Sequence, residues 1–430
     1  PTETALTEAC LRPLCAELRQ RVYVDFPSIT YYTFWLLTEY PHIARTVSSR
    51  YAEFLIDEMQ DTDSLQVRLL MRIADVGRSR FVLVGDPHQS LLGFAGAEPQ
   101  RMHELAEHIN ARDDFELVDN WRSSEHIVRL ADALCPRDTA MRASGDTRDY
   151  QVTPRIVVAN SAVDVVTGAF LPLLEQEEVD VSDAAILAPA WYHLHPNAQE
   201  MRRLGVPVSG PGSRPYNRRG RLLTGLLENV CACVPSTRPN LLPRVQYEII
   251  DLVQRIAGVT RFEVWERAGR LAAMRLVFRA RELRETHNTA IPWIEHASQE
   301  FGDLLVDSGL LTRAGTEQLV QAGAAIVADI RRNRNIEPED LNVEDLGTFA
   351  NPDGSLQLLP LHSAKGREFD AVCIVDLQEG QMPHPRGDVD ESRRVLYVGL
   401  TRPRKLLMLA HRRGSTTCRF LQEPEIRRHL

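Results

Sequence analysis

Two apolar runs, each ending in acidic and amide side chains, constrain the fold of this 430-residue chain more than any other feature. The first reads FLIDEMQD from Phe54 to Asp61, and the second begins FVLVGDPHQS at Phe81. Apolar runs of this length are typical of buried strands in a parallel sheet, where ligands bind beside the carboxyl ends of the strands. A single run of this kind is more often a plain strand end that meets solvent. Two runs with glutamine in matching places indicate a nucleotide site.

The sequence around these runs alternates between strand and helix patterns, as in a parallel α/β sheet. The expected elements are helices before Phe54, strands to Asp57 and Asp86, helices over Ser64–Ala74 and Pro99–Asn110, a short strand FELVDNW ending at Trp121, and a helix from Ser123 or Ser124 through Leu134. A second α/β run starts at Arg155–Asn160 and Asp183–Ala190, and β-type patterns resume in LQLLPLHSAKG, AVCIVDL and VLYVGLTRPRKLLMLAH. Between about 221 and 336 only helical periodicity is found, which predicts an all-helical insertion in the second sheet.

Composition is that of a globular protein, with 43% hydrophobic and 25% charged residues. No apolar stretch approaches the roughly 20 residues of a membrane-spanning helix, and the first residues lack a signal-peptide pattern, so we expect a cytoplasmic protein without a membrane partner. The seven cysteines show no paired CxxC spacing and imply neither a zinc site nor a disulfide framework. The net charge of −9 disfavours a generally basic nucleic-acid binder but permits a local basic groove.

The residues at the ends of the two runs suit phosphate chemistry. Asp57 and Glu58 can hold Mg²⁺ and can orient or deprotonate a water that attacks a phosphate. Gln60 and Gln89 both donate and accept hydrogen bonds, which suits contact with a phosphate or a lytic water. These carboxylates and amides predict a site for a nucleoside triphosphate and its Mg²⁺.

The basic residues carry a second signal. Arg122 and Arg402 follow strand-like segments, where a guanidinium can stabilise charge on a transferring phosphoryl group, although a surface ion pair is the commoner role of any one arginine. Among 50 Lys and Arg residues the only lysines are Lys365 and Lys405. Neither lysine follows a glycine, so the chain has no G-x-x-x-x-G-K-[ST] phosphate loop. We therefore expect an upstream segment with that loop to be missing from this chain.

Five motifs in one order resemble those of UvrD/Rep-type superfamily 1 helicases. They are FLIDEMQD (the Walker B motif), VGDPHQSLLGFAGA, DNWRS, LHSAKGREF and ESRRVLYVGLTRPRK. The resemblance implies an α/β protein with two RecA-like parallel-sheet domains, the first incomplete at its N-terminus, and an all-helical insertion in the second. The implied ranges are 1–118 for domain 1A with its preceding helices, 119–220 and 346–430 for the two parts of domain 2A, and 221–345 for a 2B-like insertion.

The resemblance also implies roles for individual residues. For the reaction, it implies Asp57 as the Mg²⁺ ligand, Glu58 as the catalytic base, Gln89 as a γ-phosphate contact, and Arg122 and Arg402 as the arginine fingers. For the nucleotide, it implies that Trp121 stacks on adenine, that Glu368 contacts the ribose beside Gly366, and that Gln60 and Asp86 are further contacts. For DNA, it implies that Phe94 stacks on a base and that His362, Ser363 and Lys365 are contacts. For Phe94 and Trp121 the plain alternative is a core aromatic residue. The chain departs from the family pattern at Leu92, Ala95, Arg367 and Pro403. The change at Ala95 removes an arginine and puts the coupling of ATP to DNA in doubt.

The implied function is an ATP-dependent DNA helicase or translocase that moves 3′ to 5′ on single-stranded DNA. ATP and Mg²⁺ are the implied cofactors, and single-stranded or partly duplex DNA is the implied partner. The alternative is an ATPase-deficient truncated helicase that binds DNA or a nuclease as a regulatory subunit. The segment GDPHQS…GAEP also resembles the helicase-like subunits of Gabija-type antiphage systems. The pathway is therefore either DNA repair or antiviral defence. A nucleotide-binding enzyme of another class, such as a kinase, is disfavoured because the chain has no Gly-rich loop.

Overall fold

The computed structural model describes residues 26–91, 100–112, 115–210, 214–216, 222–235, 241–257, 266–332, 339, 341–350 and 354–430. The chain forms two compact units, which we describe separately. Unit 1 comprises Pro1–Gln151, Pro383–Thr401 and Arg419–His429, and unit 2 comprises Val152–Met382, Arg402–Cys418 and Leu430. The predicted α/β class with parallel sheets is confirmed, since each named strand pairs in parallel with its neighbours. The four predicted domain ranges stay a prediction.

Unit 1 opens with helices that pack beside a two-stranded sheet. Its first elements are α2 (Phe26–Glu39), α3 (Pro41–Arg50), β1 (Glu53–Ile56), α4 (Ser64–Ala74) and β2 (Arg80–Leu83). Asp63 begins α4 because its carboxylate accepts from the N–H groups of Leu65 and Gln66 in a capping box. The rings of Phe54 and Phe81 stack with centroids 5.1 Å apart, which ties the two strands to the helices that pack on them. Of the helices expected before Phe54, those over Phe26–Arg50 are confirmed, as is the helix α4, whereas the helical pattern over Ala5–Val22 lies outside the described residues.

The rest of unit 1 shows two corrections. Its elements are α5 (Gln100–His108), β3 (Asp119–Asn120), α6 (Glu125–Leu134), β4 (Arg142–Ala143), α16 (Val389–Leu400) and α17 (Pro424–Arg427). FELVDNW is not a full strand: only Asp119 and Asn120 pair, and Phe115 and Leu117 are exposed with no neighbouring strand. VLYVGL is helical in α16, because Asp388 caps the helix and the apolar run is buried as a helix end. A short buried run alone does not distinguish strand from helix.

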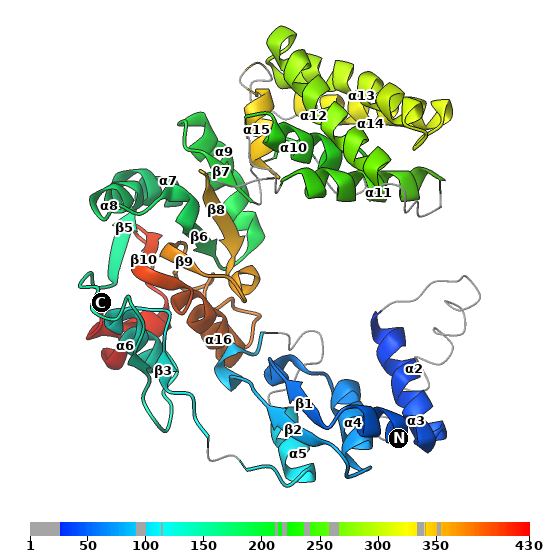
Figure 1. The fold of residues 1–430 in the computed structure, drawn as a ribbon. Coiled ribbons are helices and arrows are strands. Elements are labelled where there is room, and N and C mark those ends of the chain that lie inside the picture. The colour runs from blue at the N-terminus through cyan, green and yellow to red at the C-terminus, as the bar shows by residue number, and fades with distance from the viewer. Residues whose placement is uncertain are drawn as a thin grey trace. The chain divides into compact units, whose positions relative to one another are not determined.

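Unit 2 contains a six-stranded parallel sheet in the order β5-β10-β9-β6-β8-β7. The strands are β5 (Arg155–Ala159), β6 (Ala184–Ala188), β7 (Val208–Ser209), β8 (Leu356–Pro360), β9 (Phe369–Ile374) and β10 (Pro403–Arg412), and the helices between them are α7 (Ala162–Val165), α8 (Leu171–Gln176) and α9 (Trp191–Arg203). Strands far apart in sequence are neighbours here, since β6 lies between β8 and β9 (Figure 1). The chain therefore leaves this sheet after β7 and returns to it at β8.

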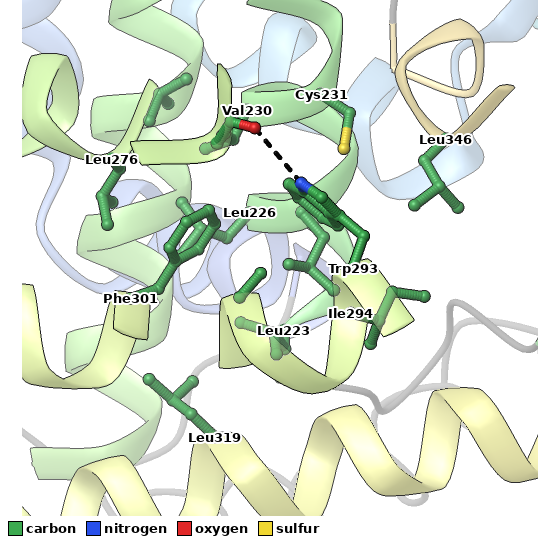
Figure 2. Packing of buried hydrophobic residues seen from close by; sticks show 14 of the residues in the cluster. Leu223, Leu226, Val230, Cys231, Leu276, Trp293, Ile294, Phe301, Leu319 and Leu346 are labelled. Carbon is green, nitrogen blue, oxygen red and sulfur yellow. Dashed lines mark hydrogen bonds between the residues drawn. The ribbon is translucent and has the colours of Figure 1, made fainter. Parts of the chain in front are cut away.

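Helices fill the interval between β7 and β8. They are α10 (Thr224–Cys233), α11 (Leu242–Ala257), α12 (Arg267–Thr286), α13 (Ala290–Asp307), α14 (Arg313–Arg332) and α15 (Val343–Thr348). Trp293 and Phe301 are fully buried at the centre of their core, and their rings meet edge to face (Figure 2). No strand is assigned between β7 and β8 in the described ranges, which confirms the predicted helical insertion. No described helix has both the length and the apolar character that crossing a membrane requires.

Candidate nucleotide site and DNA contacts

Asp57 and Glu58 lie at the carboxyl end of β1, as the sequence predicts. Parallel pairing sets Ile56 opposite Leu83, so the ends of β1 and β2 meet at one edge of the sheet. Glu58 has a left-handed backbone (φ 52°), and its N–H donates to Asp57 Oδ1 over 2.8 Å. A non-glycine residue rarely adopts this conformation, and such residues gather at functional sites. The turn leaves both carboxylates exposed to solvent.

Gln60 connects the two strand ends and is only 1% exposed. Its Nε2 donates to Glu58 Oε2 over 2.5 Å, and its Oε1 accepts from the N–H of Asp86 over 3.0 Å. Gly85 permits this approach, because a Cβ at that position would lie 2.7 Å from Gln60 Oε1. The structure therefore places Gln60 between Glu58 and Asp86, where protein groups bond both ends of its amide.

Asp86 is the centre of a second set of contacts, at the 3₁₀ turn Pro87–Gln89. Its Oδ1 accepts from the N–H of His88 over 3.0 Å, and its Oδ2 accepts from Gln89 Nε2 over 2.9 Å. Arg137 Nη2 also donates to Oδ2, over 2.6 Å. Asp86 thus orients Gln89 from within the protein, which is a different contact from the nucleotide contact that the resemblance implies.

Burial and neighbouring charges shift the pKa values around Asp86. Burial lowers the pKa of His88 below its ordinary value of 6.5, and the arginines Arg137 and Arg394 lower it further. Burial lowers the pKa of Arg137, but Tyr397 and Asp86 outweigh it and leave that pKa above its ordinary value. Burial raises the pKa of Tyr397, and the charge of Asp86 raises it further. At neutral pH the site therefore contains a neutral imidazole, a cationic guanidinium and an un-ionised phenol.

Trp121 and Arg122 follow β3 in unit 1. The Trp121 side chain is 73% exposed, which excludes the core alternative for this ring. The N–H groups of Arg122 and Ser123 both donate to Asn120 Oδ1, over 3.0 and 2.9 Å. Arg122 Nη1 donates to the carbonyl oxygen of Thr401 over 3.3 Å, so its guanidinium lies at the end of α16. The asparagine turn thus holds an exposed ring and a half-buried cation side by side.

Arg402, Gly366 and Glu368 belong to unit 2. Arg402 follows a helix, α16, and not the strand that we expected before it. It is 2% exposed, and its Nη1 donates to the carbonyl oxygen of Arg367 over 3.4 Å. Gly366 has φ 75°, a backbone conformation that strains any residue with a Cβ. Glu368 pairs with Arg404 over 2.9 Å. The three predicted residues thus lie around the segment between β8 and β9 and the start of β10.

The predicted DNA contacts of unit 2 lie at the carboxyl end of β8. His362 and Ser363 are exposed in the 3₁₀ turn Leu361–Ala364, and Lys365 follows it half-buried. Phe94 lies outside the described residues. His362 and Ser363 therefore lie exposed just after the carboxyl end of β8, and ligands of parallel sheets bind beside such strand ends.

The structure joins four of the unit 1 predictions in one network, from Glu58 through Gln60 and Asp86 to Gln89, whereas the guanidinium of Arg122 bonds the carbonyl oxygen of Thr401. Sequence reasoning missed Arg137 and Tyr397, which complete it. Tyr397 lies within the quoted motif ESRRVLYVGLTRPRK, and this was the only available signal for it. Nothing in the sequence around Arg137 indicates its partners.

The carboxylates of Asp57 and Glu58 suit a divalent cation that keeps its waters better than one enclosed by protein ligands. The described residues contain no group of three or more His, Cys, Asp or Glu side chains arranged to hold a metal. Asp57 and Glu58 offer two exposed carboxylates at a strand end. Mg²⁺ usually keeps several waters and takes one or two carboxylates together with substrate phosphates. This pair therefore suits Mg²⁺ that arrives with a nucleotide.

Comparisons with known proteins give consistent matches at both ends of the chain. The sequence model of the UvrD/REP helicase N-terminal domain matches residues 2–110, and that of the UvrD-like helicase C-terminal domain matches residues 333–413. Similar proteins include the "DNA helicase II" of Escherichia coli K12, 24% identical over 90% of this chain and 59% of that protein. A "Probable DNA helicase II homolog" of Rickettsia felis is 23% identical over 90% of this chain and 65% of its own length. The "ATP-dependent DNA helicase UvrD1" of Mycobacterium tuberculosis H37Rv is 24% identical over 91% of this chain and 59% of its length, so the chain spans less than two thirds of these relatives.

Proposed function

Because this chain belongs to the UvrD/Rep-type superfamily 1 helicases, we propose that its full protein is a DNA helicase that uses ATP hydrolysis to move 3′ to 5′ along single-stranded DNA. The observation that carries the proposal is the connected network of Glu58, Gln60, Asp86 and Gln89 at the edge of the first sheet. Such a network keeps a carboxylate and an amide in fixed positions beside an exposed aspartate. Pre-organised polar groups of this kind are what phosphoryl transfer requires.

Glu58 is the proposed general base. Its carboxylate has two oxygens with about four acceptor positions, so one bond from Gln60 orients it without exhausting its capacity. The exposed position lets it accept a proton from a water placed for attack on a γ-phosphate. Asp57 would hold Mg²⁺, which when bound neutralises phosphate charge. Gln89 would contact the γ-phosphate or the attacking water.

The arginines and the exposed aromatic ring have separate proposed roles. Arg122 and Arg402 are fixed by backbone carbonyl groups, over 3.3 and 3.4 Å, and a fixed guanidinium can stabilise charge that develops on a transferring phosphoryl group. Trp121 offers an exposed face for an adenine ring, and Glu368 with Gly366 would contact the ribose. His362, Ser363, Lys365 and Phe94 are the proposed DNA contacts. A nuclease partner and a role in phage defence stay predictions.

The test is ATPase activity of the full-length native protein with and without single-stranded DNA. We expect hydrolysis that DNA stimulates and that Glu58→Gln lowers by about 10²- to 10⁴-fold. Displacement of streptavidin from biotinylated oligonucleotides gives the direction: 3′ to 5′ movement displaces it faster from the 5′ end. An intact full-length protein that binds DNA but never hydrolyses ATP would contradict the proposal and would favour the regulatory-subunit alternative.

A further inference from the structure

A half-buried ion pair, Arg137 with Asp86, contacts Gln89, the proposed γ-phosphate contact. Asp86 Oδ2 accepts from Gln89 Nε2 over 2.9 Å and from Arg137 Nη2 over 2.6 Å. The same carboxylate therefore bonds both the amide and the guanidinium. Without the guanidinium, a mostly buried carboxylate would lose its counter-charge, and it would regain hydration only by moving toward solvent.

The pair is shielded more than most ion pairs among the described residues. The side chains of Arg137 and Asp86 are 24% and 19% exposed, whereas those of Arg80 and Glu53, a surface pair on β1 and β2, are 83% and 54% exposed. Surface pairs contribute little because water screens them, but a shielded pair with short, charge-assisted hydrogen bonds fixes its geometry. We therefore expect Arg137 to hold Asp86 in one position.

The same Nη2 atom of Arg137 also contacts α16. It donates to the hydroxyl oxygen of Tyr397 over 2.7 Å, and Tyr397 is 1% exposed. Two further contacts join α16 to the turn that contains Gln89: Arg394 Nε donates to the carbonyl oxygen of Ser90 over 3.1 Å, and the rings of His88 and Tyr397 lie 5.8 Å apart. The turn is thus fixed against a helix whose end also accepts the guanidinium of Arg122 at Thr401.

We propose that Arg137 is a positioning residue for ATP hydrolysis, which acts through Asp86 to hold the Gln89 amide in its working orientation and through Tyr397 to tie that amide to α16. The proposal rests on the proposed function, because it takes Gln89 as the group that touches the nucleotide. Arg137 itself touches no substrate. Its loss therefore lowers the rate of the chemical step more than it weakens binding of ATP or DNA.

The experiment compares Arg137→Ala, Arg137→Lys and Tyr397→Phe in the full-length protein. A misplacement of about 1 Å at a reacting group can cost about 100-fold, so we expect kcat for DNA-stimulated hydrolysis to fall about 10- to 100-fold in Arg137→Ala. KM for ATP and Kd for a fluorescent dT oligonucleotide should change less than about threefold, because the displaced Gln89 amide would lose contacts that form in the transition state. Arg137→Lys keeps the charge, but its side chain is shorter and lacks the rigid guanidinium fork, so it should recover part of kcat. Tyr397→Phe removes only the hydroxyl contact and should cost less than Arg137→Ala.

Arg129→Ala is the matched control, because Arg129 lies on α6 and forms an exposed pair with Glu125. It should behave like the wild type. A wild-type kcat in Arg137→Ala would overturn the inference while leaving the proposed function intact. A lower kcat that comes with a comparably higher KM, weaker DNA binding and a lower melting temperature would also overturn it, since these changes together indicate a purely structural role. A wild-type protein without DNA-stimulated hydrolysis would remove the proposed function and the inference with it.

Discussion

The two parallel sheets place their residues in different surroundings. In β6 of unit 2 all five residues are buried, whereas β1 and β2 of unit 1 alternate between exposed and half-buried positions. Leu55 on β1 is 76% exposed, and Leu187 on β6 is 0% exposed. Burial of apolar surface therefore stabilises the second sheet more than the first.

The polar groups at the strand ends also differ between the units, and here unit 1 has the more connected hydrogen bonds. In unit 1 the Gln60 side chain donates to Glu58 and accepts from the backbone N–H of Asp86, and the Asp86 carboxylate accepts from the Gln89 side chain. In unit 2, Arg402 is bonded to a backbone carbonyl, and Glu368 is engaged by Arg404. Stability and chemistry are therefore separated: substitutions within β6 should destabilise unit 2, and substitutions at the end of β1 should slow the reaction.

The largest expected effect is on catalysis in unit 1. Glu58→Gln keeps the shape of the side chain and an acceptor for Gln60, but it removes the proposed base. General-base catalysis contributes about 10²- to 10⁴-fold, so kcat for ATP hydrolysis should fall by about that factor with little change in melting temperature. Glu53→Gln at the start of β1 is the control, because Glu53 forms an exposed pair with Arg80 in the described part of the chain. An active Glu58→Gln enzyme would assign the base to another residue.

The second prediction tests the difference in burial. Leu187→Ala in β6 should lower the free energy of unfolding of unit 2 by about 2–5 kcal/mol, because it leaves a cavity in a buried sheet. Leu55→Ala should change that of unit 1 by less than about 0.5 kcal/mol, because this side chain is already in water. Urea denaturation of both variants gives the values. Equal losses would mean that the outer face of β1 is covered in the native protein.

A smaller effect is expected for the exposed ring at the end of β3. Stacking of an aromatic ring contributes about 0.5–1.5 kcal/mol beyond burial, so Trp121→Ala should raise KM for ATP about 3- to 10-fold. Phe115→Ala is a matched control, since Phe115 is 75% exposed in the same unit and no nucleotide role is predicted for it. Steady-state ATPase kinetics measure both. An equal change in the two variants would contradict adenine stacking by Trp121.

Local sequence patterns predicted those features that depend on near neighbours. The periodicity and capping residues identify α4, and FLIDEMQD identifies the end of β1, because the relevant contacts lie within a few residues. VLYVGL shows the limit, since a buried helix end and a buried strand have the same letters. Arg137 was missed because its partners Asp86 and Tyr397 are 51 and 260 positions away, and only the folded chain brings them together. Gln60 was predicted for the site, but its burial between Glu58 and Asp86 needed the structure.

The smallest expected effect is a difference between the two units in how their stability depends on pH. The pKa of His88 in unit 1 is lowered from 6.5 by burial, so as pH falls below about 6.5 the unfolded chain takes up a proton that the folded unit does not, and unit 1 loses stability. In unit 2, burial raises the pKa of Asp376, but the contacts with His193 and Arg412 outweigh it and leave that pKa below its ordinary value of 3.8. Asp376 therefore stabilises unit 2 above about pH 3.8, and this stabilisation is lost only as pH falls further toward the lowered pKa. As pH falls from 7.5 to 5.5, the protection factors for hydrogen exchange, which correct for the lower intrinsic exchange rate, should fall at His88, Gln89 and α16 more than in β9, and His88→Gln should reduce that difference. An equal fall of the protection factors in both units, unaffected by His88→Gln, would show that His88 does not control the stability of the turn that positions Gln89.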